Sequence, residues 1–324
     1  MFGEYAELSW GLPVVLYLFL AGLGSGALIT SASILLRGPS GAIGKTYMKV
    51  ARYGALIAPF PLIIGCGLLI LELGSFQTGH WFRFLYLYTV LNLSPMSVGT
   101  WLLTLFIPVS IGYAATFFAW PAPFEAKRAL LRRILAWIGL PFGIAVAVYT
   151  GVLLGAMPAR PFWNTPILAL LFLISSISTG IASVLLVRNI YENRVSDKAK
   201  LTRMRNSDYI LTATDVIFIG FELMVVFLFI MYAHLTIGGV QIAISVVLPG
   251  GELASLFWIG FVLIGLIIPG LIEMFAVAPR LLFGRKFHST LTMDIVAASA
   301  VLIGGFLLRY VVLIAGQITG PVGI

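Results

Sequence analysis

Residues Tyr149–Ala182 read YTGVLLGAMPARPFWNTPILALLFLISSISTGIA, which is the end of one apolar helix, a short polar hinge and the start of the next helix. The hinge contains three prolines, and because proline cannot continue a helix interior, the chain must turn there. Trp163 suits a membrane–water interface, where its ring is half apolar and its N–H is wet. Tyr149 lies six residues before Gly155, roughly 9 Å below the hinge at about 1.5 Å per residue. A phenol and the guanidinium of Arg160 are therefore expected near one face of a membrane.

The composition is that of a membrane protein. Hydrophobic residues make up 60% of the chain and charged residues 10%, which is typical of a polytopic membrane protein rather than a soluble domain. Eight apolar runs are long enough to cross a hydrocarbon core of about 30 Å. We predict an all-α protein, a single integral membrane domain over residues 1–324, with eight transmembrane helices arranged as two four-helix bundles. The runs lie near residues 12–36, 53–73, 96–119, 134–155, 166–187, 209–234, 253–277 and 290–315.

The basic residues cluster in alternate links between the predicted spans. Four follow span one, four follow span three, six follow span five and three follow span seven, which together are 17 of the 20 Lys and Arg residues. Only Arg83, Arg160 and Arg309 belong to the other side. Because cytoplasmic loops carry the excess of Lys and Arg, the crowded links are predicted to be cytoplasmic. Both termini and the hinge then face outward, to the periplasm of a Gram-negative cell, from the bacterial cytoplasmic (inner) membrane.

Several kinds of site are excluded by the residues available. The net charge of +8 reflects membrane topology, so no nucleic-acid partner is expected; membrane lipid is the expected surrounding. The single cysteine, Cys66, cannot build a disulfide, a thiolate zinc site or an iron–sulfur cluster. Of the three histidines only His234 falls near a span, which argues against a haem held by two histidines. We expect no metal, haem or iron–sulfur cluster in this chain, and we find no nucleophile elbow or phosphate loop.

Ionisable groups in the predicted spans each require a partner or a function. Such a group costs at least about 2.5–3.5 kcal/mol at the bilayer centre. Asp215 and Glu222 lie seven residues apart, hence on one helix face and about 10 Å apart along the axis. The others are Glu72 at the outer end of span two, Glu273 and Asp294 in the inner parts of spans seven and eight, and Arg309 in the outer part of span eight.

Two interpretations of these polar residues stay open. In the functional one, a small polar ligand near the outer face is surrounded by Glu72, Tyr149, Arg160 and Tyr17, and a polar track continues inward through Glu222 and Asp215, as in proton relays. In the structural one, Glu222 and Arg309 form a pair, or Arg309 reaches the outer interface. Asp294 then serves as a helix-start residue favoured by the helix dipole, and Tyr17 as a packing residue.

Small residues recur at a spacing that permits close helix packing. The pairs are Gly22 with Gly26, Gly139 with Gly143, and Gly151 with Gly155. Residues four apart lie on one helix face, and glycine there lets two backbones approach closely. We therefore expect tight helix contacts at these positions.

Four motifs together resemble the NrfD/PsrC family, the membrane subunits of polysulfide reductase and related molybdopterin oxidoreductases. Span one contains LYLFLAGLGSGA from Leu16 to Ala27, and the opening stretch contains YTGVLLG from Tyr149 to Gly155. A Ser-x-x-Ser-x-Gly pattern runs from Ser175 to Gly180, and the last span contains LRYVVLIAGQ over residues 308–317. The resemblance extends over nearly the whole chain and agrees with eight spans and outward termini.

The resemblance implies a quinone-binding role. Members of this family carry no redox centre of their own and bind a quinone, usually menaquinone, near the outer face. A four-cluster iron–sulfur subunit on the periplasmic side exchanges electrons with that quinone, and a molybdopterin catalytic subunit lies beyond it. Tyr149 matches the position whose phenol donates to a quinone carbonyl, and Glu72 matches an acid near the same site. Glu72 is then the candidate proton acceptor.

The leading hypothesis is therefore a quinone- or quinol-reactive membrane anchor of a respiratory oxidoreductase complex, either oxidising quinol or reducing quinone. The inward track through Glu222, Asp215 and Arg309 is a candidate proton path. An alternative is a secondary transporter or ion channel, motivated by the mid-membrane acid Glu222 with Asp215. A third hypothesis is a purely structural anchor that binds no quinone.

Overall fold

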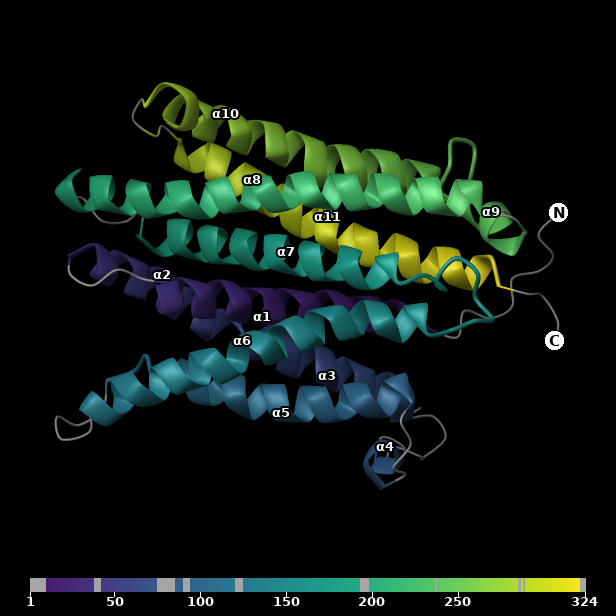
Figure 1. The fold of residues 1–324 in the computed structure, drawn as a ribbon, viewed down its shortest axis with the longest axis horizontal. Helices are drawn as coiled ribbons and strands as arrows, with labels where there is room; N and C mark the ends of the chain where they lie inside the picture. Colours follow the sequence, from purple (N-terminus) through teal and green to yellow (C-terminus); the bar gives the residue numbers. More distant parts are fainter. Residues whose placement is uncertain are drawn as a thin grey trace.

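The computed structural model describes residues 10–37, 42–74, 85–89, 94–119, 125–192, 198–236, 238–284, 287 and 289–320, and within these ranges it contains helices and no strands (Figure 1). Arg83, His80 and His288 lie outside the described residues. The helices are α1 (Leu12–Arg37), α2 (Ala42–Ile57), α3 (Pro59–Gly74), α4 (Tyr86–Thr89), α5 (Pro95–Ala115), α6 (Glu125–Gly155), α7 (Ile167–Glu192), α8 (Lys198–Leu235), α9 (Gly239–Ile244), the π-helix η4 (Leu256–Ile267), α10 (Ile268–Phe283) and α11 (Leu291–Ile318).

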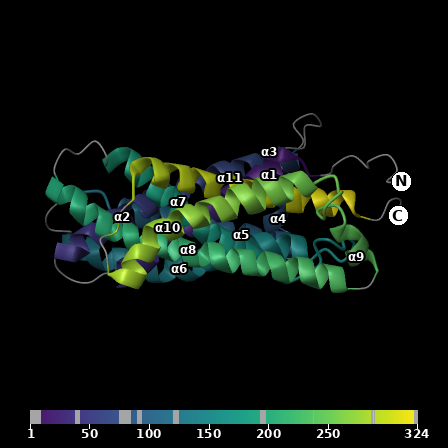
Figure 2. The same cartoon turned by 90° about the horizontal axis from the view of Figure 1, so that it is seen from above.

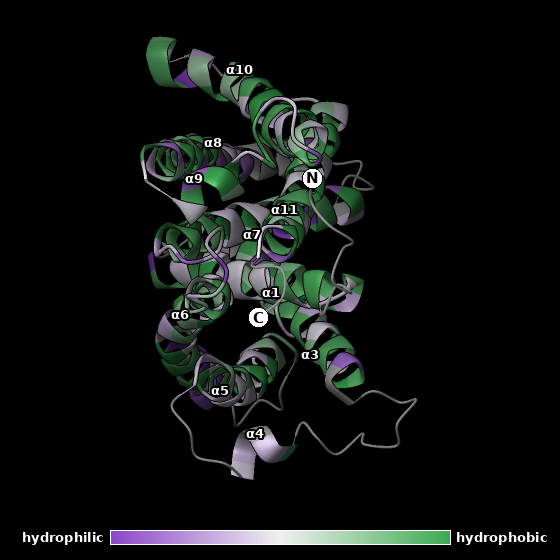
Figure 3. Ribbon diagram, turned by 90° about the vertical axis from the view of Figure 1, so that its right-hand side faces the viewer, coloured by the Kyte–Doolittle hydropathy of each residue, from purple (hydrophilic) through white to green (hydrophobic). Residues whose placement is uncertain are grey.

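Eight segments in the described part of the chain are long and apolar enough to cross a membrane, which confirms the predicted all-α class and the number of spans. One of them, Tyr47–Glu72, joins α2 and α3, and another, Leu256–Phe283, joins η4 and α10. Large apolar side chains cover the flanks of the molecule, among them Phe275, which is 71% exposed, and Trp137, which is 63% exposed. Coloured by hydropathy, the long helices are mostly hydrophobic, whereas the short helix α4 is not (Figure 3). Such a belt suits lipid rather than water.

The second span differs from the predicted run at 53–73 because it is built from two helices. α2 begins at Ala42, and the helix is interrupted at Ala58, directly before Pro59. The residue before a proline is disfavoured in the helical region, because the proline ring clashes with its backbone. The Ala58 N–H still donates to the Gly54 carbonyl at 3.0 Å, so the two helices continue as one span.

The two ends of the molecule differ in what they carry. Both described termini lie at one end, with the turn between α6 and α7 and with α9 (Figures 1 and 2). The C-terminal ends of α1, α5, α7 and α10 lie at the opposite end. That end includes Arg37 at the end of α1 and Arg280 in the last turn of α10. We call it the basic end; the prediction that it faces the cytoplasm stays a prediction.

The helix contacts follow the chain in two groups. α1 packs against α2, α3 and α6, and α5 packs against α3 and α6. In the second half α7 packs against α8 and α11, and α10 packs against α8 and α11. The two groups meet where α7 contacts α1 and α6 and where α1 contacts α11. The division into two four-helix bundles stays a prediction.

α1 and α7 touch backbone to backbone. A Cβ added at Gly26 would lie 1.7 Å from the Ser176 carbonyl oxygen, and one added at Gly180 would lie 2.2 Å from the Gly26 carbonyl carbon. No larger residue fits at this crossing, so the predicted close packing is confirmed at Gly26. Gly151 is confirmed in the same way, since a Cβ there would lie 2.6 Å from the Leu168 carbonyl oxygen. The first contact fixes α1 against α7, which carries the serine motif, and the second fixes α6 against α7 beside the hinge.

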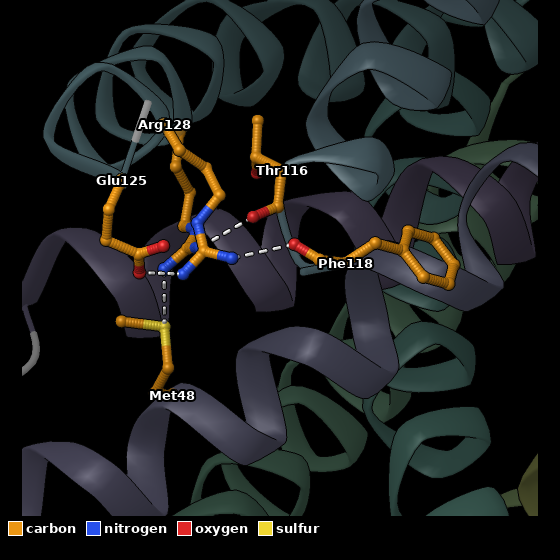
Figure 4. Close-up of polar contacts among 6 residues, drawn as sticks. Met48, Thr116, Phe118, Glu125 and Arg128 are labelled. Atoms are coloured by element: carbon orange, nitrogen blue, oxygen red, sulfur yellow. Dashed lines mark hydrogen bonds and ion pairs between the residues drawn. The ribbon is translucent and has the colours of Figure 1, made fainter. Parts of the chain in front are cut away.

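At the basic end, two arginines of α6 bind the carbonyl groups that follow α5 (Figure 4). Arg128 pairs with Glu125 and donates to the Phe118 carbonyl oxygen at 2.8 Å. Arg132 donates to the Thr116 carbonyl oxygen at 2.5 Å and to the Met48 sulfur at 3.4 Å. The last carbonyls of a helix have no partner within it, and basic side chains satisfy them well. The two arginines therefore hold the start of α6 against the residues that follow α5.

Candidate functional site

A cavity of about 230 Å³ lies between α1, α3, α5 and α6. It is close to the end that carries the termini, because it is bounded by Trp10 just before α1 and by Glu72 near the end of α3. Three of the four residues predicted to bind a ligand, Tyr149, Glu72 and Tyr17, contribute to its wall. The remaining lining residues are Val14, Leu69, Met96, Thr100, Leu103 and Leu153. Most of the wall is apolar, with the two phenols, a carboxylate and a hydroxyl facing the same space.

Tyr149 is held by a glycine on the neighbouring helix. It projects from α6 and is almost completely buried. A Cβ added at Gly99 of α5 would lie 1.7 Å from Tyr149 Cζ and 1.9 Å from its hydroxyl oxygen. The phenol therefore occupies the space that any side chain at Gly99 would take. Its position in the cavity depends on this close approach of α5 and α6.

Tyr17 brings a second phenol to the cavity from α1. Its side chain is fully buried and lies beside Tyr149 and Cys66. Its hydroxyl has no partner with full hydrogen-bond geometry among the described residues. The Tyr149 phenol is its nearest polar neighbour, and a polar group in the cavity could give this hydroxyl a better-aligned partner. The packing interpretation of Tyr17 therefore stays open beside the ligand-binding one.

Glu72 is positioned by the backbone of the segment that enters α1. It is half-buried near the end of α3, and its Oε1 accepts a hydrogen bond from the Gly11 N–H at 3.3 Å. The first N–H groups of a helix lack partners within it, so a carboxylate there satisfies a donor. This interaction connects the acid of α3 to the start of α1 and leaves the acid beside the cavity.

Arg160 does not line the cavity. Its guanidinium donates to the Gln317 carbonyl oxygen at 2.7 Å and lies 5.8 Å from the Trp163 ring. The Gln317 side chain in turn binds the backbone N–H and carbonyl of Trp10, both at 3.0 Å. Arg160 thus stands behind the cavity wall and supports Trp10 through the end of α11.

The expectation that the Trp163 N–H is exposed to water is wrong. Trp163 is 2% exposed, its indole N–H donates to the Val312 carbonyl oxygen at 2.7 Å, and its ring stacks on Trp10 with centroids 5.6 Å apart. The hinge folds back over the ends of α1 and α11, so the indole finds a protein acceptor instead of water. Trp163 therefore packs behind Trp10, which lines the cavity.

Arg309 lies in the protein interior and does not reach the surface as one interpretation required. It is 0% exposed and donates to Ser175 Oγ at 2.9 Å, to Ser176 Oγ at 3.1 Å and to the Gly305 carbonyl oxygen at 2.7 Å. Its guanidinium also lies 5.3 Å from the Phe172 ring. The expectation that it reaches the interface is wrong, because the serine motif of α7 supplies its partners inside the bundle.

The acids of α8 form a buried row that begins beside Arg309. Glu222 is buried and interacts with Arg309 and with Ser175, which itself binds Arg309. Asp215 is buried as well and accepts a hydrogen bond from Ser178 Oγ at 2.7 Å. The residues share one face of α8, as their spacing predicted. No side-chain ion pair within 4.0 Å joins Glu222 to Arg309 among the described residues; the two charges interact over a longer distance, and Ser175 contacts both.

Two further acids continue this row toward the basic end. Glu273 of α10 is buried and interacts electrostatically with Asp215 and with Asp294. Asp294 lies in the first turn of α11, where Ser289 donates to it and Thr290 caps the helix. The helix-start interpretation of Asp294 agrees with this position. One oxygen each of Asp215, Glu222 and Glu273 lacks a hydrogen-bond partner among the described residues.

Sequence reasoning missed the residues that complete the cavity from distant segments. Trp10 and Thr100 line it, Gly11 binds Glu72, and Gly99 makes room for Tyr149. An aromatic residue directly before span one was a usable signal for Trp10. The pairing of Gly99 with Tyr149 depends on how α5 packs on α6, which no local pattern reveals. Among the described residues no group of three His, Cys, Asp or Glu side chains could hold a metal ion.

Comparison with known proteins gives one family. The family described as "Polysulphide reductase, NrfD" matches residues 1–321. The chain is similar to a polysulfide reductase chain of Wolinella succinogenes, with 32% identity over 97% of this chain and 96% of the relative. It is 28% identical to protein NrfD of Escherichia coli over 98% of this chain and 97% of the relative. A selenate reductase subunit of Mesobacillus selenatarsenatis is 21% identical over 85% of this chain and 69% of the relative.

Proposed function

The chain belongs to the NrfD family, and we propose that it is the quinone-reactive membrane subunit of a respiratory oxidoreductase complex. Its relatives are named as parts of polysulfide and selenate reductases. With eight membrane-spanning helices, the role of membrane subunit in such a complex follows from the family. The proposal adds the ligand, its site and the side of the membrane on which electrons are exchanged.

The observation that carries the proposal is that Tyr149 and Glu72 face the same cavity. A quinone ring needs a hydrogen-bond partner at each carbonyl and an apolar slot. Leu69, Leu103 and Leu153 supply apolar wall. The volume of about 230 Å³ is smaller than the roughly 300–1,000 Å³ of pockets that enclose whole drug-sized ligands. It therefore suits the ring alone, and the isoprenoid tail stays among lipid.

The residues of the cavity have distinct roles in this proposal. A bound quinol supplies the redox chemistry, with two electrons and two protons released on oxidation. Tyr149, fixed against Gly99, orients the ring by donating a hydrogen bond to one ring oxygen. Glu72 takes one of the two protons from the other ring oxygen, which requires hydrogen-bond reach, and the second proton passes to water at the end that carries the termini. Tyr17, whose hydroxyl lacks a full partner, stabilises a polar atom at the inner end of the ring.

The proposal includes partners and a side of the membrane. We infer that an iron–sulfur subunit with four clusters docks at the end that carries the termini, on the periplasmic side, and passes electrons to or from a molybdopterin subunit. The position of the cavity near that end supports this placement. Menaquinone is the proposed quinone, in a bacterial cytoplasmic membrane. The basic residues at the opposite end support the orientation.

The buried row from Arg309 through Glu222 to Asp215 is proposed as a proton path toward the basic end. Carboxylates with an unpartnered oxygen inside a membrane protein are suited to proton transfer. Ser175 and Ser178 give both acids a hydroxyl neighbour. The same row motivates the alternative of a secondary transporter or channel; solute flux into liposomes by the isolated chain would favour that function.

Two substitutions in the assembled complex test the proposed site. Tyr149→Phe and Glu72→Gln keep the shape of each side chain and remove one hydroxyl or one charge. We expect quinol-linked activity to fall by roughly 10²–10⁴-fold for Glu72→Gln, the range for a lost general base, with the complex still fully assembled. Tyr232→Phe is the control, because Tyr232 is partly exposed on α8 and is absent from the cavity wall. Wild-type activity in both test variants would reject this site.

A further inference from the structure

A second and larger hollow, of about 430 Å³, lies between α1, α2, α7 and α8 toward the basic end. We call it the basic-end groove. It shares no lining residue with the Tyr149 cavity. Its apolar wall comes from four helices, and polar atoms are few. The lining residues are Ile29, Thr30, Ser33, Ile34, Arg37, Tyr47, Ile177, Ile181, Ile210, Leu211, Thr214 and Phe218.

One face of α1 lines the groove with hydroxyl side chains in its deeper part and with the guanidinium of Arg37 at its opening. Thr30, Ser33, Ile34 and Arg37 are spaced at i, i+3, i+4 and i+7, so they share a helix face. Thr30 lies about 10 Å deeper along the axis than Arg37 at about 1.5 Å per residue. On α8, Ile210 is 43% exposed and marks the open rim, and Phe218 lies about two turns deeper. The groove is thus an elongated slot with a cation at its mouth.

The Thr30 hydroxyl in the slot has no hydrogen-bond partner among the described residues. Thr30 is 6% exposed, and its Oγ1 is buried. Mid-helix threonines usually satisfy the hydroxyl with a carbonyl of their own helix. An unpaired buried hydroxyl costs roughly 1–3 kcal/mol. A ligand with an acceptor oxygen at this depth would remove that cost.

Arg37 supplies the charge that selects the ligand. Its side chain is exposed at the end of α1, and no described residue forms a hydrogen bond or an ion pair with it. Tyr47 of α2 lies on the same rim. A guanidinium and a phenol can both donate to a phosphate oxygen. Basic pockets between transmembrane helices on the cytoplasmic side are suited to anionic lipid head groups.

We propose that the basic-end groove binds one anionic glycerophospholipid of the leaflet at the basic end. Its phosphate meets Arg37 and Tyr47, a glycerol ester carbonyl accepts from Thr30, and an acyl chain lies along Ile177, Ile181 and Phe218. A neutral quinone carries no negative charge for the cation at the mouth, whereas a phospholipid matches the order of groups along the slot: charge, ester oxygen, hydrocarbon. The lipid would join α1 and α2 to α7 and α8 across the seam between the two halves.

Native mass spectrometry of the purified full chain in detergent tests the proposal. Phosphatidylglycerol, zwitterionic phosphatidylethanolamine and neutral diacylglycerol are titrated separately into delipidated protein. We expect phosphatidylglycerol to bind at one copy per protein molecule and most tightly of the three. Arg37→Gln should weaken phosphatidylglycerol about fivefold, as a basic residue near an anionic head group predicts, and leave diacylglycerol unchanged. Thr30→Val should weaken both lipids, since both contain the ester.

Two further variants keep the test decisive. Arg52→Gln is the matched control, because Arg52 is an exposed basic residue of α2 outside the groove, and it should bind phosphatidylglycerol as the wild type does. Ile177→Trp fills the slot and should abolish the one-copy binding, with the melting temperature of the lipid-free protein showing that each variant folds. Equal uptake of diacylglycerol and phosphatidylglycerol, retention of phosphatidylglycerol by Ile177→Trp, or its displacement by one quinone would each overturn the proposal.

Discussion

Substitution of Gly99 by alanine tests how strictly the position of Tyr149 matters. The added Cβ would lie 1.7 Å from Tyr149 Cζ, whereas ordinary contacts between carbon atoms begin near 3.5 Å. The phenol must therefore retreat by about 1.8 Å, or α5 and α6 must separate by a similar amount. A misplacement of about 1 Å at a reacting group can cost 10²-fold in rate. We expect Gly99→Ala to lower quinol-linked turnover of the assembled complex by at least about 10²-fold.

The control for this prediction lies on the same helix. At Gly112 of α5 an added Cβ would have its nearest neighbour, Leu135 Cδ1, at 3.5 Å, which is ordinary contact. Alanine also favours a helix over glycine by about 1 kcal/mol, so neither substitution should destabilise α5 through its backbone. Gly112→Ala should therefore keep wild-type turnover.

A double variant identifies the cause of the loss. If Gly99→Ala acts by displacing the phenol, Gly99→Ala with Tyr149→Phe should be no worse than the worse single variant, because both remove the same interaction. The assay is quinol oxidation coupled to the catalytic subunit, with subunit stoichiometry and melting temperature measured in parallel. Wild-type turnover in Gly99→Ala, or multiplied losses in the double variant, would refute the reasoning.

Two further predictions concern the surroundings of the cavity. Trp163→Phe removes the hydrogen bond to Val312 and weakens the stacking on Trp10, so it should cost about 1–3 kcal/mol of stability and raise the KM for quinol. Trp137→Phe, at an exposed position of α6, is the control. An unchanged KM in Trp163→Phe would limit Trp163 to a stabilising role. Glu222→Gln should keep quinol oxidation within about twofold and reduce proton movement across the membrane of liposomes that hold the complex, since it removes the acid beside Arg309 and Ser175. If the variant keeps both activities, Glu222 is excluded from a proton path.

The fold was predictable because membrane insertion leaves a strong signal in the sequence. Long apolar runs and alternating basic links determine the number of spans and place both termini at one end. The boundaries were less accessible: α2 begins before the apolar part of its span, and α6 starts at Glu125, well before residue 134. Amphipathic first turns at the basic end are helical but are too polar to count as membrane segments.

The site was predictable only where one residue carries the signal. Tyr149 and Glu72 stand out as polar groups near the ends of apolar helices, and the structure brings both to one cavity. Arg160 carried the same signal, yet it turns to Gln317 because the hinge folds over α11. The partners of Arg309 could not be predicted from a single span, since they belong to the serine motif on another helix. Whether a predicted residue lines the cavity depends on the direction of its side chain between the packed helices, which the residue type alone does not give.

The clasp between Gln317 and Trp10 joins residues at opposite ends of the sequence, 307 positions apart. During synthesis the four helices around the cavity enter the membrane early, but the last helix, which carries Gln317, enters at the end. Until it does, Trp10 lacks the amide that holds its backbone and the hinge lacks the carbonyl that receives Arg160. The cavity wall formed by Trp10 is therefore held in place only after the last helix has packed against the start of α1.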